Sequence, residues 1–347
     1  MRRARRGVAA LAGLGLVLAG CGTSAAPARG EVFRIGTTSG IDSMNPFVGI
    51  NEEGYSAWMH MYPSLLQYDT SKPDLPYRPS LAESWKLADD GLSLRFTIRE
   101  GARWSDGEPL DATDAAWSLN VFREFHETAA AGWSVGSTIE SVTAPDARTL
   151  VLRFTERSAL SLYDVATTPL LPPQVWEKYA GGDGSALKTF DNTPEGGEAM
   201  VGGGPFVLSR YRQGETAIFT ANPHWYGDKP SIQQFGLQTF RAPDAMITAL
   251  ASGDLDAAYG VPPTGLKALE SANVETHGEP ALALRDLIIN SNPDKPKNRE
   301  LLDRPYIVLT YDQRIDAWSR EWEGLIPSTQ GFFNNRSTQS LESVHRR

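Results

Sequence analysis

The side chains that could catalyse a reaction or hold a metal ion are scattered along this chain. Its five histidines show none of the short spacings that zinc ligands share; they are His60, His126, His224, His277 and His345. The Gly-x-Ser-x-Gly sequence that marks the nucleophile of many hydrolases does not occur. We therefore expect structural or solvated histidines, no metal, no cofactor and no catalytic residue.

Two further patterns have ordinary structural explanations. The acidic pairs Asp89-Asp90 and Glu52-Glu53 fall in a predicted turn and at a predicted helix start, where solvation and capping account for them. The glycine run Gly202-Gly203-Gly204 is not a phosphate-binding loop, because no Gly-Lys-Ser/Thr follows and Pro205 leads into a strand. Two carboxylates that converge in space, as in a glycosidase, leave no trace in a sequence. A surface hydrolase therefore stays open as an alternative.

Residues 79–120 contain the clearest structural pattern, a hairpin followed by a capped helix. Asp90-Gly91 is a two-residue turn signal. The alternation of apolar and polar residues after it predicts a strand with one buried face; its apolar members are Leu92, Leu94, Phe96 and Ile98. Asp111 can cap the next helix, with Asp114 three residues on supporting its first turn.

Similar patterns predict elements elsewhere in the chain. Strands are expected at 31–36, 138–142, 149–154 and 282–290, and helices at 53–68, 160–166 and 243–251. The last helix has a proline in its first turn and ends before Gly253.

Composition places the chain among ordinary globular proteins. It has 347 residues, of which 41% are hydrophobic and 22% charged, enough for two domains. A net charge of −9 gives little support to nucleic-acid binding. The many aromatic residues suit ligand surfaces, but core packing is the simpler explanation for most of them.

The N-terminus has the pattern of a processing segment. A basic stretch, 1–6, precedes an apolar stretch, 8–19, that is too short for a comfortable membrane span. It ends in Leu-Ala-Gly-Cys21, which resembles a bacterial lipobox and implies cleavage before Cys21 and lipidation of that residue. The alternative is a plain secretory signal with a chance cysteine. We expect a signal peptide at 1–20, a flexible tether at 21–30 and, with a single cysteine, no intrachain disulfide.

The identities of residues 79–120 are more specific than their pattern of apolar and polar positions. Pro79-Ser-Leu-Ala-Glu-Ser-Trp85, Asp89-Asp-Gly-Leu92 and Trp104-Ser-Asp-Gly107 resemble the signature region of the oligopeptide/dipeptide class (family 5) of bacterial extracellular solute-binding proteins. These proteins are the receptors of ABC importers. Two later stretches also resemble the family. Gly202–Phe206 is similar to its Gly-Thr-Gly-Pro-Tyr motif, and Asn222-Pro-His-Trp-Tyr-Gly227 to its Asn-Pro-x-Tyr-Trp-Gly motif with the aromatics exchanged.

The resemblance implies an α/β fold like that of periplasmic binding proteins (class II type), with mixed sheets and a ligand cleft between two lobes. Matches to cleft-facing loops of the family imply three ligand-binding residues, Ser39, Asn45 and Tyr259. For Asn45, a role as a turn starter before Pro46 is an equal alternative.

The chain departs from the family after Asp303. Arg304 to Leu309 resembles the extreme C-terminus of the family instead of the expected further lobe, so we expect a domain-sized deletion at about 303/304. The first lobe would combine 31–66, 203–300 and 304–347. A hairpin-rich domain, 67–202, would be inserted into it, and the second ligand-binding lobe would be largely missing.

The function implied by the resemblance is that of a lipid-anchored, monomeric receptor on the extracytoplasmic face of the cell membrane or in the periplasm. Its partners would be peptides or a related solute, the membrane subunits of an ABC permease, and the membrane through its lipid. Two alternatives remain: a deletion product of such a receptor that binds nothing, and a surface lipoprotein enzyme.

Overall fold

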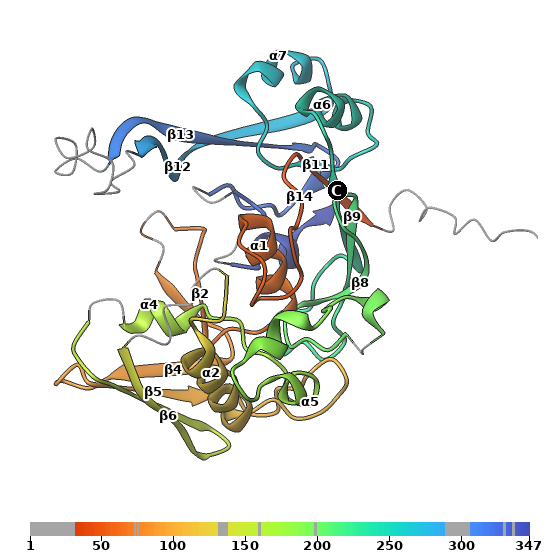
Figure 1. The fold of residues 1–347 in the computed structure, drawn as a ribbon. Coiled ribbons are helices and arrows are strands. Elements are labelled where there is room, and N and C mark those ends of the chain that lie inside the picture. Colours follow the sequence, from red (N-terminus) through yellow and green to blue (C-terminus); the bar gives the residue numbers. More distant parts are fainter. Residues whose placement is uncertain are drawn as a thin grey trace, which may run out of the picture.

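The computed structural model describes residues 32–72, 74, 76–130, 138–158, 161–197, 200–288, 306–328, 331–334 and 337–347, with only the backbone at 164, 281–288 and 306–312. Figure 1 shows a long two-stranded ribbon, β12–β13, below helices α6 and α7, and a separate sheet containing β4, β5 and β6 at the opposite end of the molecule. The mixed α/β fold expected from the sequence is confirmed.

The larger sheet has seven strands in the order β12-β13-β11-β1-β10-β9-β8. Its strands are β12 (Val274–Ile288), β13 (Tyr306–Ser319), β11 (Ala257–Ala258), β1 (Phe33–Thr37), β10 (Gln234–Thr239), β9 (Thr216–Ala221) and β8 (Phe206–Arg212). The central strand β1 runs parallel to both of its neighbours, β10 and β11, whereas the remaining pairs are antiparallel. The sheet is therefore mixed, and its parallel part is at the centre.

Helices cover both faces of this sheet around β1. On one face, α6 (Pro243–Ala251) packs so closely that a Cβ atom on Gly36 would lie 2.9 Å from the Met246 side chain. On the other face, α1 (Glu52–Met61) places His60 with its ring centroid 5.5 Å from that of Phe235. The start of α1 is fixed by Asn51, whose side-chain oxygen accepts a hydrogen bond from the Gly54 amide at 2.9 Å.

The smaller sheet has the order β4-β5-β7-β6 and is antiparallel throughout. Its strands are β4 (Ala82–Leu87), β5 (Ser93–Ile98), β7 (Thr149–Phe154) and β6 (Ile139–Asp146). The predicted hairpin and capped helix are both confirmed, but Leu92, expected on the buried face of the strand, precedes β5 and is 38% exposed. Gly91 has a φ of 68° in the turn, and Asp111 and Asp114 form a reciprocal capping box on α2 (Ala112–Phe125).

The remaining elements are short. Two small antiparallel pairs join β2 (Leu66–Tyr68) to β3 (Tyr77–Pro79) and β14 (Trp322–Glu323) to β15 (His345–Arg346). Short helices are α4 (Ser161–Ala166), α5 (Pro173–Trp176), α7 (Leu266–Leu269) and α8 (Gln339–Ser343). Within the residues described, no helix is long and apolar enough to cross a membrane.

Three expected elements differ in length. The strand expected at 282–290 belongs to β12, which begins at Val274, and the strand expected at 138–142 continues to Asp146 as β6. The helix predicted at 53–68 ends at Met61, and its last residues form strand β2 instead. The physical reason is Pro63, which cannot donate a helical hydrogen bond and pushes Tyr62 into extended backbone with a ψ of 140°.

The proposed boundaries at 66/67 and 202/203 are not marked by a gap in the core. A single buried cluster contains Phe33 and Phe235 from the larger sheet as well as Phe96 and Leu150 from the smaller one. The division into lobes therefore stays a prediction, and the proposed deletion point at 303/304 lies outside the described residues.

Candidate ligand site at the ends of the parallel strands

The central strands of the larger sheet define a natural place for a ligand. Strands β1, β10 and β11 are parallel, so their carboxyl ends, at Thr37, Thr239 and Ala258, lie at the same edge of the sheet. The connection from β10 to β11 passes over β1 through α6, which makes β1 the point where the strand order reverses. In open α/β sheets the loops outside such a point form a crevice that binds ligands.

Three side chains from distant parts of the chain meet at this edge. The hydroxyl of Tyr259, in the loop after β11, donates a hydrogen bond to Glu52 Oε1 at 2.9 Å. Arg314, on β13, donates to Glu52 Oε2 at 3.0 Å and also to the Tyr259 hydroxyl. Its guanidinium lies over the Tyr259 ring, 4.6 Å from the centroid. This group of three residues is called the Glu52 cluster below.

The charges of the Glu52 cluster follow from its surroundings. Burial raises the pKa of Tyr259 well above its usual value, so its phenol stays protonated and acts as a donor. Burial opposes the charge on Arg314, but the hydrogen bond and charge of the Glu52 carboxylate outweigh it, so the pKa of Arg314 is raised. The cluster thus presents a permanent cation and a neutral hydroxyl around one carboxylate.

A second carboxylate, Glu53, lies beside the first on α1. Its side chain accepts a hydrogen bond from Ser39 Oγ at 2.8 Å, and it is only 6% exposed. Burial is the main reason that the pKa of Glu53 is raised. A void of about 10 Å³ between Glu53, Ser39 and Tyr211 is near the lower limit for holding one water molecule.

Asp316 holds the loop that carries Tyr259 in place. Its carboxylate accepts hydrogen bonds from the Gly260 amide at 3.2 Å and from the Phe332 amide at 3.0 Å. Gly260 has a φ of 72°, in the left-handed region that favours glycine. Asp316 is 4% exposed, and burial raises its pKa to about 6. Asp316 therefore fixes the loop without facing solvent.

The structure places the predicted site residues differently. Ser39 and Tyr259 lie at the same edge and bond to neighbouring residues of α1, Glu53 and Glu52. Asn45 is 3% exposed, and its side-chain amide donates to the carbonyl oxygens of Leu187 and Phe190 at 2.7 and 2.9 Å. Its amide oxygen accepts from the Phe47 amide at 2.8 Å, so all its polar groups are engaged within the protein. Contact of these three residues with a ligand stays a prediction, and Cys21 lies outside the described residues.

Sequence reasoning missed Glu52, Arg314 and Asp316 as members of the site. Both acids of the pair Glu52-Glu53 lie in the first turn of α1, as expected for a helix start. Glu52 also accepts a hydrogen bond from Arg314. Only the order of the parallel strands would have indicated the meeting point.

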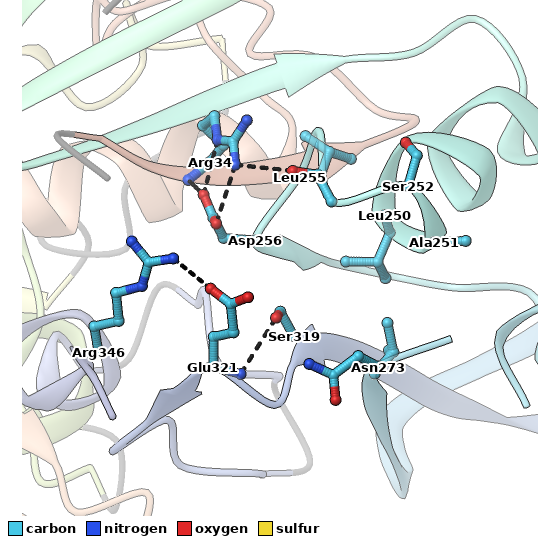
Figure 2. Close-up of a pocket in the computed structure, with 12 residues that line it drawn as sticks. Arg34, Leu250, Ala251, Ser252, Leu255, Asp256, Asn273, Ser319, Glu321 and Arg346 are labelled. Carbon is cyan, nitrogen blue, oxygen red and sulfur yellow. Dashed lines mark hydrogen bonds and ion pairs between the residues drawn. The ribbon is translucent and has the colours of Figure 1, made fainter. Parts of the chain in front are cut away.

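A polar cavity of about 270 Å³ lies by the other end of β1, around Arg34 and Asp256 (Figure 2). Arg34 Nε donates to Asp256 Oδ2 at 2.9 Å, and Arg346 pairs with Glu321 across the cavity. This cavity lies at the amino ends of the parallel strands, opposite the edge where open α/β sheets bind ligands, so it is a weaker candidate than the edge at the Glu52 cluster.

Comparison with known proteins identifies the family of the chain. The model of the family described as bacterial extracellular solute-binding proteins, family 5 Middle, matches residues 76–305. The chain belongs to this family. The resemblance found in the sequence is thereby confirmed, and the family is one of solute-binding proteins.

The curated relatives include Protein XP55 of Streptomyces lividans, 35% identical over 247 residues that make up 70% of this chain and 40% of that protein. The probable D,D-dipeptide-binding periplasmic protein of Escherichia coli (strain K12) is 26% identical over 301 residues, 85% of this chain and 54% of the relative. The chain spans about half the length of the curated relatives it matches.

Solved structures share the fold. The oligopeptide-binding protein of Bacillus subtilis, in complex with a nonapeptide, matches with a TM-score of 0.67 at 20% identity over 78% of this chain and 52% of the other. A Campylobacter jejuni protein in complex with Ni(L-His) matches with a TM-score of 0.65 at 21% identity over 77% of this chain and 51% of the other. The expected periplasmic-binding-protein-like fold is confirmed over that part of the chain.

Proposed function

We propose that this chain is the substrate-binding receptor of an ABC importer and that it binds a peptide or a related small solute at the Glu52 cluster. The observation that supports this most is the meeting of Glu52, Tyr259 and Arg314 at the carboxyl ends of the parallel strands, in a chain of the family 5 class. The chain would deliver its solute to the permease as a monomer held at the membrane by a lipid on Cys21.

Relatives offer a short list of solutes to try. One is named as a probable D,D-dipeptide-binding protein, and another as a nickel-binding periplasmic protein. Solved neighbours hold peptides, Ni(L-His) and an opine-type acid, mannopinic acid. Their shared feature is a polar solute with hydrogen-bonding groups, which suits a site that exposes a carboxylate and a guanidinium together.

The test is a titration of the full chain with a pool of short peptides, with nickel(II)–histidine and with mannopinic acid, followed by calorimetry or native mass spectrometry. Ser39→Ala removes the hydroxyl that bonds to Glu53 at this edge and should weaken binding several-fold, as expected for one hydrogen bond. Ser93→Ala, on β5 in the smaller sheet, is the matched control and should leave binding unchanged. If both variants bind as tightly as the parent, Ser39 does not contribute to ligand binding.

A second candidate is favoured by the length comparison. The chain spans about half of its relatives, and the lobe that would close the cleft is the part we expect to be missing at about 303/304. A chain of this kind could fold without binding any solute. This candidate is favoured over the receptor if the protein is folded but shows no saturable binding to any probe. Strong binding of a dye that detects exposed apolar surface would support it further.

A further inference from the structure

A cavity of about 260 Å³ lies away from the Glu52 cluster, at the junction between the two sheets. Ser80 and Arg99 contribute to it from the side of the smaller sheet, and Trp225 and Tyr226 from the loop between β9 and β10. Arg78 on β3 and Glu342 on α8 also line it, and Asp228 adds a second carboxylate. These residues form what we call the junction pocket, and the proposed receptor function does not use them.

The Asn222–Gly227 motif builds one wall of the junction pocket. Asn222 is buried, its side-chain amide donates to the Gly204 carbonyl at 2.8 Å, and its amide oxygen accepts from the His224 amide at 2.9 Å. This bonding turns the chain so that the Tyr226 hydroxyl lies 3.3 Å from Ser80 Oγ. The rings of Trp225 and Tyr226 lie with centroids 4.2 Å apart. The motif that stood out in the sequence therefore has a definite place in the fold.

The two arginines of the pocket differ in how far their charge is satisfied. Arg78 donates to Gln67 Oε1 at 2.6 Å and lies 3.5 Å from a carboxylate oxygen of Glu342. Arg99 donates from Nε to the Ser80 carbonyl at 3.2 Å, and its guanidinium lies 5.7 Å from the centroid of the Tyr226 ring. Its two terminal nitrogens have no hydrogen bond or ion pair to the described part of the chain. One hydrogen bond therefore orients the Arg99 side chain, and its two terminal nitrogens stay available to bind a ligand.

A half-buried guanidinium with a free fork has the geometry that recognises a planar oxyanion through two parallel hydrogen bonds. The charge balance limits the anion. Two arginines line the cavity with Glu342 and Asp228, so the lining is close to neutral. A doubly charged anion such as phosphate would meet these two acids, whereas a single carboxylate adds one negative charge beside Arg99. The volume, below the usual range for drug-sized ligands, suits a compact molecule.

We propose that the junction pocket is a second binding site, for a small carboxylate that pairs with the terminal nitrogens of Arg99 and packs against Tyr226. The carboxylate can come from a free organic acid or from the C-terminus of a short peptide, since both present the same group. A ligand here contacts residues that precede β4 and follow β5 on one side and the β9–β10 loop on the other. Its binding therefore stabilises the packing of one sheet against the other.

The experiment is calorimetric titration of the full chain at constant ionic strength with propionate, with N-acetyl-glycylglycine and with inorganic phosphate. Propionate tests the free acid and N-acetyl-glycylglycine tests a peptide C-terminus. We expect saturable binding of at least one carboxylate and weaker binding of phosphate. Arg99→Gln should raise the dissociation constant about tenfold or more, because it removes a charge-assisted pair of hydrogen bonds.

Two further variants keep the test decisive. Arg153→Gln removes an exposed arginine on β7, outside the pocket, and should bind as the parent does. Arg99→Lys keeps the positive charge but loses the paired terminal nitrogens, so it should bind with intermediate affinity. It also replaces Arg99→Gln in the test if that variant does not fold. The proposal is overturned if the carboxylates do not bind the parent chain, if Arg99→Gln and Arg99→Lys bind them unchanged, or if phosphate binds more tightly. The effect of the Arg99 variants separates this site from the Glu52 cluster, because Arg99 lines the junction pocket and is not part of that cluster.

Discussion

Arg314 and Glu52 are 262 positions apart in the sequence, yet the guanidinium of the first donates a hydrogen bond to the carboxylate of the second at 3.0 Å. The contact ties β13, after the undescribed stretch 289–305, to the first turn of α1 near the start of the fold. Tyr259 lies between them and bonds to both. The edge of the sheet that we propose as a ligand site is therefore held by a contact between the two ends of the described chain.

Removal of this contact should cost stability. Arg314→Gln leaves Glu52 partly desolvated and removes the cation from the Tyr259 ring, so we expect a loss of about 2 kcal/mol in the free energy of unfolding. Urea unfolding measures this. Arg212→Gln breaks the ion pair with Glu215, in which both side chains are at least 70% exposed, and should cost less than about 1 kcal/mol. Equal losses in the two variants would contradict a structural role for Arg314.

The buried His60 should make the protein sensitive to acid. Its ring is fully buried, stacks on Phe333 with centroids 5.1 Å apart, and burial lowers its pKa from 6.5 to about 4. Because the unfolded chain takes up this proton first, the folded state loses stability as pH falls from about 6.5 to about 4, by about 3 kcal/mol in full. His60→Phe should flatten that fall in urea unfolding measured across this range. His224→Phe, at an exposed position, is the control and should keep the parental slope.

Asp316 should affect the pH dependence of stability in the opposite direction to His60, because its protonation stabilises the folded state as pH falls. Burial raises its pKa from 3.8 to about 6, so the folded state takes up this proton before the unfolded state does. The cost of the buried charge is present above about pH 6 and is relieved as pH falls toward 4. Asp316→Asn loses that relief, and its stability should fall more steeply than that of the parent between pH 6 and 4. Asp89→Asn, at an exposed turn, should follow the parent, and a shallower slope in Asp316→Asn would refute this assignment.

The glycine run at 202–204 should tolerate no side chain at its last position. A Cβ atom on Gly204 would lie 2.4 Å from the carbonyl oxygen of His60, a backbone atom that cannot move without shifting α1. Gly204→Ala should therefore destabilise the protein by about 1–3 kcal/mol, measured by thermal or urea unfolding. Gly181→Ala is the matched control, because a Cβ atom there meets no described atom within 4 Å and its change should stay within about 0.5 kcal/mol.

The features that the sequence predicted well are those that depend on neighbours in the chain. The turn at Asp90-Gly91, the buried alternation of Leu94, Phe96 and Ile98, and the cap at Asp111 are set by interactions over a few residues. The helix Pro243–Ala251 has the predicted bounds for the same reason. Where a local signal was overlooked, as with Pro63 at the end of α1, the predicted length was wrong.

Only the tertiary structure decided which polar residues meet. Asn45 and Ser39 look alike as loop residues near the first strand, but Asn45 is buried against Leu187 and Phe190, whereas Ser39 lies exposed beside Glu53. Glu52 joins Arg314 because β1, β11 and β13 are neighbours in the sheet, and that order depends on the packing of the whole chain. The sequence by itself therefore determined the family, the hairpin and the capped helix through local spacing. The Glu52 cluster and the junction pocket arise from contacts between segments that no local pattern connects.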